Sequence, residues 1–328
     1  MTSRQPLRRL ALASLLVVGF SAAALAQTPP WPAKPVKFIV PSNAGGSPDR
    51  VTRLLAERLA KKWNQPVVVD NKAGATSIIG TDFVAKSPAD GYTLLSTFTS
   101  FVQVPALFKK VPYDTEKDLI PVTQTVSVDV LFLVRADSPH KTLRDFAAAA
   151  KTANPPLSYG SFGNGSSFHI YGEKMNKALG INLTHVPYKG ELPSTTDLLG
   201  GQLDSSFASI GTALPFLKAG RLRPLGLVSP KRSPVVPDAP TFAEMGVAMP
   251  EVAGWFGVLA PAGTPPSVVQ KVAADIREIL TQADVVQTLR DQGLEPVAST
   301  PDVFKTRIQA DLGQWKQLLP EVGINPGD

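Results

Sequence analysis

The segment from Val36 to Arg53 constrains the fold of this chain more than any other stretch. A short apolar run, Val36 to Val40, leads into a turn with two adjacent glycines, and a helical pattern follows the turn. This order predicts a buried strand, a glycine turn and the start of a helix. Such a turn directs free backbone N–H groups and the positive end of a helix dipole at one point, which favours an anion there.

The residues of this first turn each suit a helix start that faces an anion. Ser47 stands at the expected N-cap and Pro48 at the first helical position, each a preferred residue type for its place. The two glycines permit positive φ and carry no side chain that would block a ligand. By itself, the turn is equally typical of a well-capped loop that binds nothing. The predicted ligand contacts here are Ser42, Asn43, Ala44, Gly45, Gly46, Ser47 and Asp49.

A second strand, turn and helix of the same kind lies far downstream. A predicted strand at Leu157 to Gly160 leads into a glycine turn, and a helix is expected from Phe168 to Leu179. Two such helix starts, in two lobes, can hold the two ends of one small diacid. Polar residues after other strands are expected at the same carboxyl edge, where open α/β sheets bind ligands. The further predicted contacts are Ser161, Gly163, Asn164, Gly165, Ser166 and Ser167, together with Thr97, Thr99, Ser100 and Ser209.

Strand and helix patterns alternate along the whole chain, which predicts an α/β fold. One strand is expected over Val126 to Val134, and a helix over Asp302 to Leu319 that packs back on the first part of the chain. About 300 residues favour two lobes over one core. The block from 128 to 227 repeats the strand, glycine turn and helix of the first block. We therefore predict one lobe from residues 27–127 plus 228–328 and a second lobe from 128–227.

The N-terminus has the order of a cleavable export signal. Arg4, Arg8 and Arg9 precede an apolar run from Leu10 to Phe20, and an Ala-Leu-Ala sequence ends at Ala26. This arrangement predicts a secretory signal peptide over residues 1–26, with cleavage after Ala26. The apolar run is shorter than the roughly 20 residues that span a bilayer. The mature protein is therefore expected in the periplasm, without a membrane anchor.

Composition and charge exclude several classes of function. The chain has no cysteine, and removing residues 1–26 lowers the formal net charge from +6 to about +3. The remaining bases are scattered, so we expect no nucleic-acid partner. The three histidines form neither an H-x-x-x-H nor an H-E-x-x-H pair, and no G-x-S-x-G sequence occurs. We therefore predict no catalytic residue, no metal site and no cofactor.

Two residues near the second turn leave an enzymatic function as an alternative to simple binding. His169 lies just inside the second helix, where it suits a hydrogen bond to its own loop better than catalysis. Lys189 follows the predicted strand His185 to Pro187, where it is placed either to meet an anion or to lie in solvent. Both residues are kept as predicted ligand contacts, and both would serve an exported enzyme that acts on an acid.

Seven ordered motifs make the chain resemble the Bug/TctC-type extracytoplasmic solute receptors of tripartite tricarboxylate transporters. Any one of the motifs is weak, but together they cover almost all of the mature chain in order. They lie at Trp31–Val36, Pro41–Asp49, Gln65–Asn71, Asp90–Leu94, His185–Gly190, Ala239–Glu244 and Trp255–Pro266.

The resemblance implies a two-lobed periplasmic binding protein fold of type II, with the ligand cleft between the lobes. It also implies that the turns at Ser42 to Asp49 and Ser161 to Ser167 hold a carboxylate, partly through ordered water. The family's first turn is usually richer in proline and glycine, as in Pro-Gly-Gly-Gly-Thr-Asp. Here Ser42, Asn43 and Ala44, with Ser47 and Pro48, stand in part of that place, so the family's ligands transfer poorly to this chain.

The leading hypothesis is a periplasmic receptor without catalysis. It captures a small organic acid, including di- and aromatic carboxylates, and delivers it to the permease subunits of a tripartite tricarboxylate-type transporter. The alternatives are an exported enzyme with a carboxylated substrate, and a loaded receptor that contacts a membrane sensor kinase.

Overall fold

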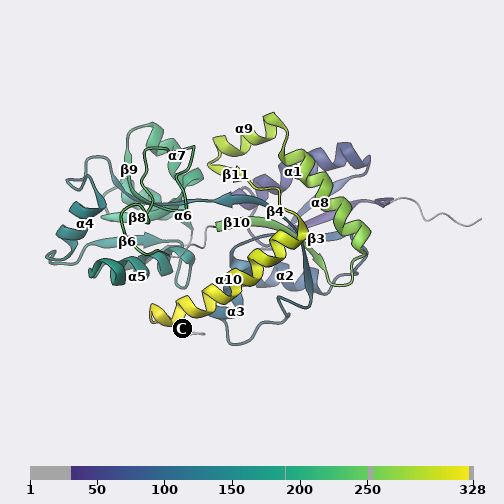
Figure 1. The fold of residues 1–328 in the computed structure, drawn as a ribbon, viewed down its shortest axis with the longest axis horizontal. Helices are drawn as coiled ribbons and strands as arrows, with labels where there is room; N and C mark the ends of the chain where they lie inside the picture. The colour runs from purple at the N-terminus through teal and green to yellow at the C-terminus, as the bar shows by residue number, and fades with distance from the viewer. Residues whose placement is uncertain (1–30, 189, 250–253, 325–328) are drawn as a thin grey trace, which may run out of the picture.

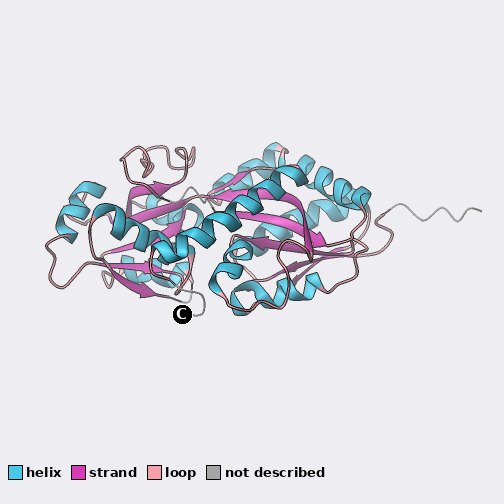
Figure 2. Cartoon of the chain, turned by 60° about the horizontal axis from the view of Figure 1, so that its bottom comes forward, coloured by secondary structure: helices cyan, strands magenta, loops and turns pink. Residues whose placement is uncertain are grey.

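The chain folds into two sheets that lie side by side along the long axis, each with helices around it (Figures 1 and 2). The computed structural model describes residues 31–188, 190–249 and 254–324, so the predicted signal peptide and Lys189 lie outside the described residues. The predicted α/β class and two-lobed arrangement are confirmed. We call the two sheets, with their helices, the first lobe and the second lobe.

The sheet of the first lobe contains β1, in which all residues but Lys37 are apolar, and β1 pairs in parallel with a neighbour on each side. A strand covered on both faces tolerates a run that is apolar but for one residue. Within the described residues, six strands form this sheet in the order β11 (Leu294–Pro296), β4 (Leu119–Val128), β10 (Gly254–Pro261), β3 (Thr93–Phe98), β1 (Val36–Val40) and β2 (Val67–Asn71).

The sheet of the second lobe repeats the plan on a smaller scale. Its β6 pairs in parallel with β7 and β8, and β5 pairs antiparallel with β8 and β9. In the part of the chain that the structure describes, five strands form it in the order β7 (Thr184–Pro187), β6 (Ser158–Ser161), β8 (Ser205–Ser209), β5 (Val130–Arg135) and β9 (Leu222–Val228).

The chain passes from the first sheet to the second at Asp129. The single strand predicted over Val126 to Val134 is wrong, because β4 ends at Val128 and β5 begins at Val130 in the other sheet. An apolar run carries no signal that its two halves pair with different partners.

The helices cover both faces of their sheets. Helix α1 packs through Val51, Leu55, Leu59 and Trp63, the inner face of its predicted periodicity. Around the first sheet lie α1 (Ser47–Trp63), the 3₁₀ turn η1 (Ala75–Ser77), α2 (Ile78–Ala85), α3 (Ser100–Leu107), α8 (Pro266–Leu280), α9 (Ala283–Asp291) and α10 (Pro301–Glu321). Around the second lie α4 (Leu143–Ala150), α5 (Ser167–Leu179), α6 (Glu191–Leu199) and α7 (Ile210–Lys218).

Helix α10 joins the two lobes. It packs on α3 and β4 of the first lobe, as predicted, and Asp311 accepts a hydrogen bond from the indole of the fully buried Trp255 at 2.8 Å. Its far end reaches α5 of the second lobe, where Glu321 pairs with Lys174 (Figure 1). The C-terminal helix therefore belongs to the first lobe by packing but contacts both lobes. No helix among the described residues is long and apolar enough to cross a membrane.

Candidate functional site

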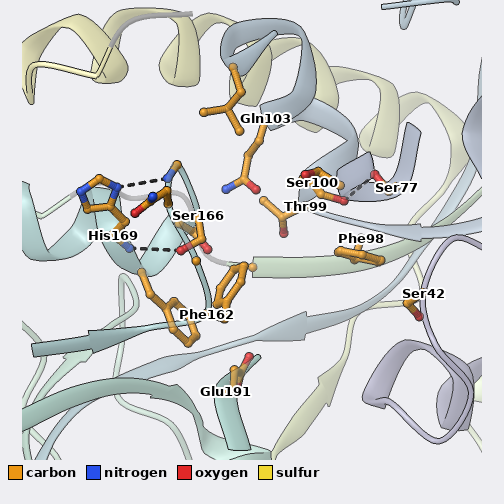
Figure 3. A pocket seen from close by; sticks show the side chains of 18 of the residues that line it. Ser42, Ser77, Phe98, Thr99, Ser100, Gln103, Phe162, Ser166, His169 and Glu191 are labelled. Carbon is orange, nitrogen blue, oxygen red and sulfur yellow. Dashed lines mark hydrogen bonds between the residues drawn. The ribbon is translucent and has the colours of Figure 1, made fainter. Parts of the chain in front are cut away.

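A cavity of about 1010 Å³ lies between the lobes, and both predicted turns contribute to its wall. The predicted residues that line it are Ser42, Asn43, Thr99, Ser100, Gly163, Asn164, Gly165, Ser166, Ser167 and His169. The predicted residues outside its lining are Ala44, Gly45, Gly46, Ser47, Asp49, Thr97, Ser161 and Ser209. Figure 3 shows Ser166 and His169 on one side and Ser42, Thr99 and Ser100 on the other.

The buried carboxylate of Asp49 holds the first turn in place through hydrogen bonds. The predicted N-cap is wrong by one residue: Gly46 caps α1 without a side-chain bond, and Ser47 is already helical. Asp49 is 2% exposed and accepts from the Gly45 N–H at 2.8 Å, from Asn71 Nδ2 at 3.0 Å and from Arg53 Nε at 3.0 Å. Burial opposes the charge, but the donors from Arg53, Gly45 and Asn71 outweigh it and hold the pKa of Asp49 below its usual range.

The second turn is closed by its own side chains. Ser166 caps α5 by accepting from the His169 N–H, and the Gly165 N–H donates to His169 Nδ1 at 3.1 Å. His169 therefore bonds its own loop, as the sequence favoured. The other N–H groups at the start of α5 have no partner within the helix, and their residues Ser167 and Phe168 line the cavity. This wall offers an anion neutral donors and a helix dipole.

A stack of three rings supports the second turn. The centroids of the His169 and His185 rings lie 3.9 Å apart with an interplanar angle of 7°, and the Tyr159 ring also stacks on His185. Ser161 Oγ lies 2.7 Å from His185 Nε2, so this predicted contact is engaged with the stack. Burial lowers the pKa of His169, and burial with the neighbouring His169 lowers the pKa of His185 to about 4. Both rings are therefore neutral at pH 7, with Nδ1 of His169 as an acceptor.

We expect the free energy of unfolding to fall as the pH drops from about 6.5 toward about 4. His185 stays neutral in the folded chain down to about pH 4, whereas an unfolded histidine takes a proton near pH 6.5. The stabilisation is complete above pH 6.5, and His185 contributes on the order of 2 kcal/mol after allowance for its partial exposure. Denaturant unfolding between pH 7.5 and 4.5 measures it. His185→Gln should flatten this dependence and His140→Gln should keep it; the reverse would contradict the assignment.

The η1 segment lines the cavity in a strained conformation that the sequence did not reveal. Three consecutive non-glycine residues have left-handed backbones, Ala75 at φ 45°, Thr76 at φ 51° and Ser77 at φ 76°. Each such residue costs on the order of 1 kcal/mol, and such strain gathers at binding sites. Ser77 Oγ pairs with Ser100 Oγ at 2.8 Å, which joins the strained turn to the start of α3.

Helix α3 is a wall of the cavity that sequence reasoning missed. It carries Gln103 and Leu107 into the lining, next to Thr99 and Ser100. Its pattern is apolar on all sides and contains Pro105, so no helical periodicity marks it. Trp255, predicted as core, is fully buried and also lines the cavity.

Glu191 is a second part of the cavity lining that the sequence did not reveal. Its Oε2 accepts from the Ser209 N–H at 3.0 Å, from Ser209 Oγ at 2.7 Å and from Thr212 Oγ1 at 2.9 Å. The hydroxyl of Ser209, predicted as a ligand contact, is thus bonded to the protein. Among the described lining residues Glu191 is the only one of the Asp, Glu, Lys and Arg types. An anion here would be held by neutral donors and helix dipoles rather than by an ion pair.

The described part of the chain shows no cluster of side chains suited to binding a metal ion. No group of three or more His, Cys, Asp or Glu side chains lies together there in a way that could hold a metal ion. The cavity therefore presents hydroxyls, amides, backbone N–H groups and aromatic rings. Such groups are suited to binding and orienting a ligand.

Comparison with known proteins assigns the chain to a family. Residues 51–324 match the model of the tripartite tricarboxylate transporter family receptor, TctC. The chain is 34% identical over 318 residues to protein BugT of Bordetella pertussis, which covers 96% of this chain and 98% of that one.

Two solved structures share the fold at similar identity. R. palustris Rpa4515 with adipate has a TM-score of 0.80 and 32% identity, over 90% of this chain and 99% of that chain. MatC from Rhodopseudomonas palustris with bound malate has a TM-score of 0.75 and 32% identity, over 88% and 99%. The chain belongs to the tripartite tricarboxylate transporter receptor family and is a periplasmic solute-binding receptor, not an enzyme.

Proposed function

We propose that this receptor captures a small organic acid in the cavity between its lobes and delivers it to a tripartite tricarboxylate-type permease. The observation that carries the proposal is the meeting of the two predicted turns at one cavity. The second turn brings the start of α5 to the wall, the first turn contributes Ser42 and Asn43, and hydroxyl groups lie on both sides (Figure 3). A carboxylate held there gains several donors without a cation.

The relatives support an acid as the ligand. One was solved with adipate and another with malate, and both match this chain over nearly nine-tenths of its length or more. The rings of Phe98, Phe162, Trp255 and Phe256 also line the cavity, which suits an acid with an apolar body. We therefore include aromatic acids among the proposed ligands.

The two lobes give binding a mechanical consequence. We propose that residues 27–127 plus 228–328 form one lobe and 128–227 the other, with residues 1–26 removed after export. A ligand that contacts both turns interacts more strongly with a closed arrangement than with an open one, so it shifts the equilibrium toward closure. The permease would then recognise the closed form of the receptor.

Thermal-shift screening of the chain from Gln27 onward tests the proposal. We expect a mono-, di- or aromatic carboxylate to raise Tm by roughly 5 °C or more, since a ligand at 100 times its Kd adds about 2.7 kcal/mol. The neutral amide of the same acid is the matched control and should give no shift. Stabilisation by sugars or cations, with none by any acid, would contradict acid binding.

Delivery to a permease needs a separate measurement in cells. Deleting the gene should abolish high-affinity uptake of the stabilising acid. Loss of induction by the acid with unchanged uptake would instead point to a sensory role.

A further inference from the structure

Gln103 has a feature that the receptor's own folding does not explain. Its side chain lines the cavity and is only 4% exposed, yet its Nε2 atom is enclosed without a hydrogen-bond acceptor. Figure 3 shows the amide end directed from α3 toward the space between the two walls, near Thr99. A buried amide without a partner destabilises a folded chain, so it calls for a specific explanation.

The hydroxyl groups of two residues that precede Gln103 on this wall, Thr99 and Ser100, have partners in the protein. Ser100 Oγ pairs with Ser77 Oγ at 2.8 Å, and Thr99 Oγ1 accepts from the Trp255 N–H at 2.9 Å. The amide of Gln103 therefore stands out between neighbours that have partners. An acceptor that enters the cavity is the simplest partner for it.

We propose that Gln103 is a specificity-determining residue whose amide donates a hydrogen bond to a second oxygen acceptor of the ligand, beyond the carboxylate held by the two turns. This inference rests on the proposed function. The chemistry is that of a carboxylate or a carbonyl oxygen, because a neutral amide donates to either without requiring a charge. The receptor thus selects acids with oxygen at two ends over acids with a plain alkyl or aryl end.

Selection of this kind has a recognisable energetic signature. A site that hydrogen-bonds a ligand group rejects the analogue without that group, because its own buried donor is then left unpaired. The same donor is already unpaired in the ligand-free chain. A leucine at this position should consequently stabilise the empty receptor and abolish the preference at once.

Binding of five named acids by calorimetry tests the proposal. Hexanoate, adipate and adipic acid monoamide form one matched series, and benzoate and terephthalate form another. We expect the wild type to bind the members with a second oxygen group at least 10-fold more tightly than hexanoate or benzoate. Gln103→Leu should bring all members of a series within about 3-fold of one another and raise the Tm of the empty receptor.

Two further variants test which group of the ligand is recognised and whether the preference depends on the position of the glutamine. Gln103→Glu keeps the size but adds a negative charge, so it should weaken adipate more than the monoamide if the recognised group is a carboxylate. Gln124→Leu is the matched control, because Gln124 is also buried but its Nε2 donates to the Val126 carbonyl at 3.4 Å, outside the cavity lining. That variant should lower the Tm and leave the preference intact.

The outcomes that overturn the inference differ from those that overturn the function. If Gln103→Leu weakens every acid equally, its amide pairs with the protein on closure and not with the ligand. If the wild type binds acids without preferring the second oxygen group, the inference fails and acid binding stands. If the wild type binds none of the five acids, the proposed function fails with it.

Discussion

Replacing Gly165 by valine should abolish binding of acids, with a loss of at least 100-fold, while the chain still unfolds cooperatively. Gly165 has φ +69°, and a Cβ built on it would lie 2.9 Å from Cδ2 of Leu107. Leu107 belongs to α3 of the first lobe, whereas Gly165 immediately precedes the N-cap of α5 in the second lobe. A valine there would displace the end of the Leu107 side chain and occupy part of the cavity that both residues line, in a backbone conformation that valine rarely adopts. Calorimetry and the thermal shift given by the acid measure the loss.

Gly180→Val is the matched control for the backbone of Gly165. Gly180 has φ +61° and ends α5, but nothing lies within 4 Å of a Cβ built on it. Both variants should lose on the order of 1–2 kcal/mol of stability from the left-handed conformation, and only the one at the cavity should lose binding. Combining Gly165→Val with Leu107→Ala should restore part of the affinity. Equal binding by the two single variants would show that the approach of Leu107 has no role.

Replacing Asp49 by alanine should lower the free energy of unfolding by about 3 kcal/mol. The buried carboxylate accepts from Gly45, Asn71 and Arg53, and its removal leaves the turn without these three bonds. The binding of acids should also weaken, although Asp49 is outside the cavity lining, because Ser42 and Asn43 lose their support. Denaturant unfolding and calorimetry measure the two effects.

The matched control for Asp49 is Asp302, which occupies the first turn of α10 but is exposed. Asp302→Ala should cost only about 0.3–1 kcal/mol, the usual contribution of an acid near a helix N-terminus. If Asp49→Ala cost no more than this, the carboxylate would not hold the turn. If Asp49→Ala destabilised the fold but left affinity unchanged, the first turn would not position the ligand.

Much of the secondary structure follows from local patterns. The run Val36 to Val40 and the face of α1 are visible in the sequence because burial against one partner imposes a period on apolar residues. Gly180 ends α5 at φ +61°, as its place after the helix predicted. Patterns that depend on two different partners are lost, and the strand predicted across Asp129 was wrong for that reason.

The candidate site, too, could be predicted from the sequence only in part. The sequence identified both turns, and ten of their predicted residues and neighbours line the cavity. Which polar groups face a ligand depends instead on bonds between distant segments. Asp49 is engaged by Asn71, and Ser209 by Glu191, so their charges and hydroxyls are directed at the protein.

The sequence by itself determined the alternation of strands and helices, the two glycine turns and the likeness to a receptor family, since each rests on residues close together in the chain. Only the tertiary structure decided that α3 forms a wall, that Leu107 lies next to Gly165, and that Nε2 of Gln103 is buried without a partner. A free donor is defined by the absence of every neighbour that might satisfy it. That property belongs to the packed molecule and has no local signature.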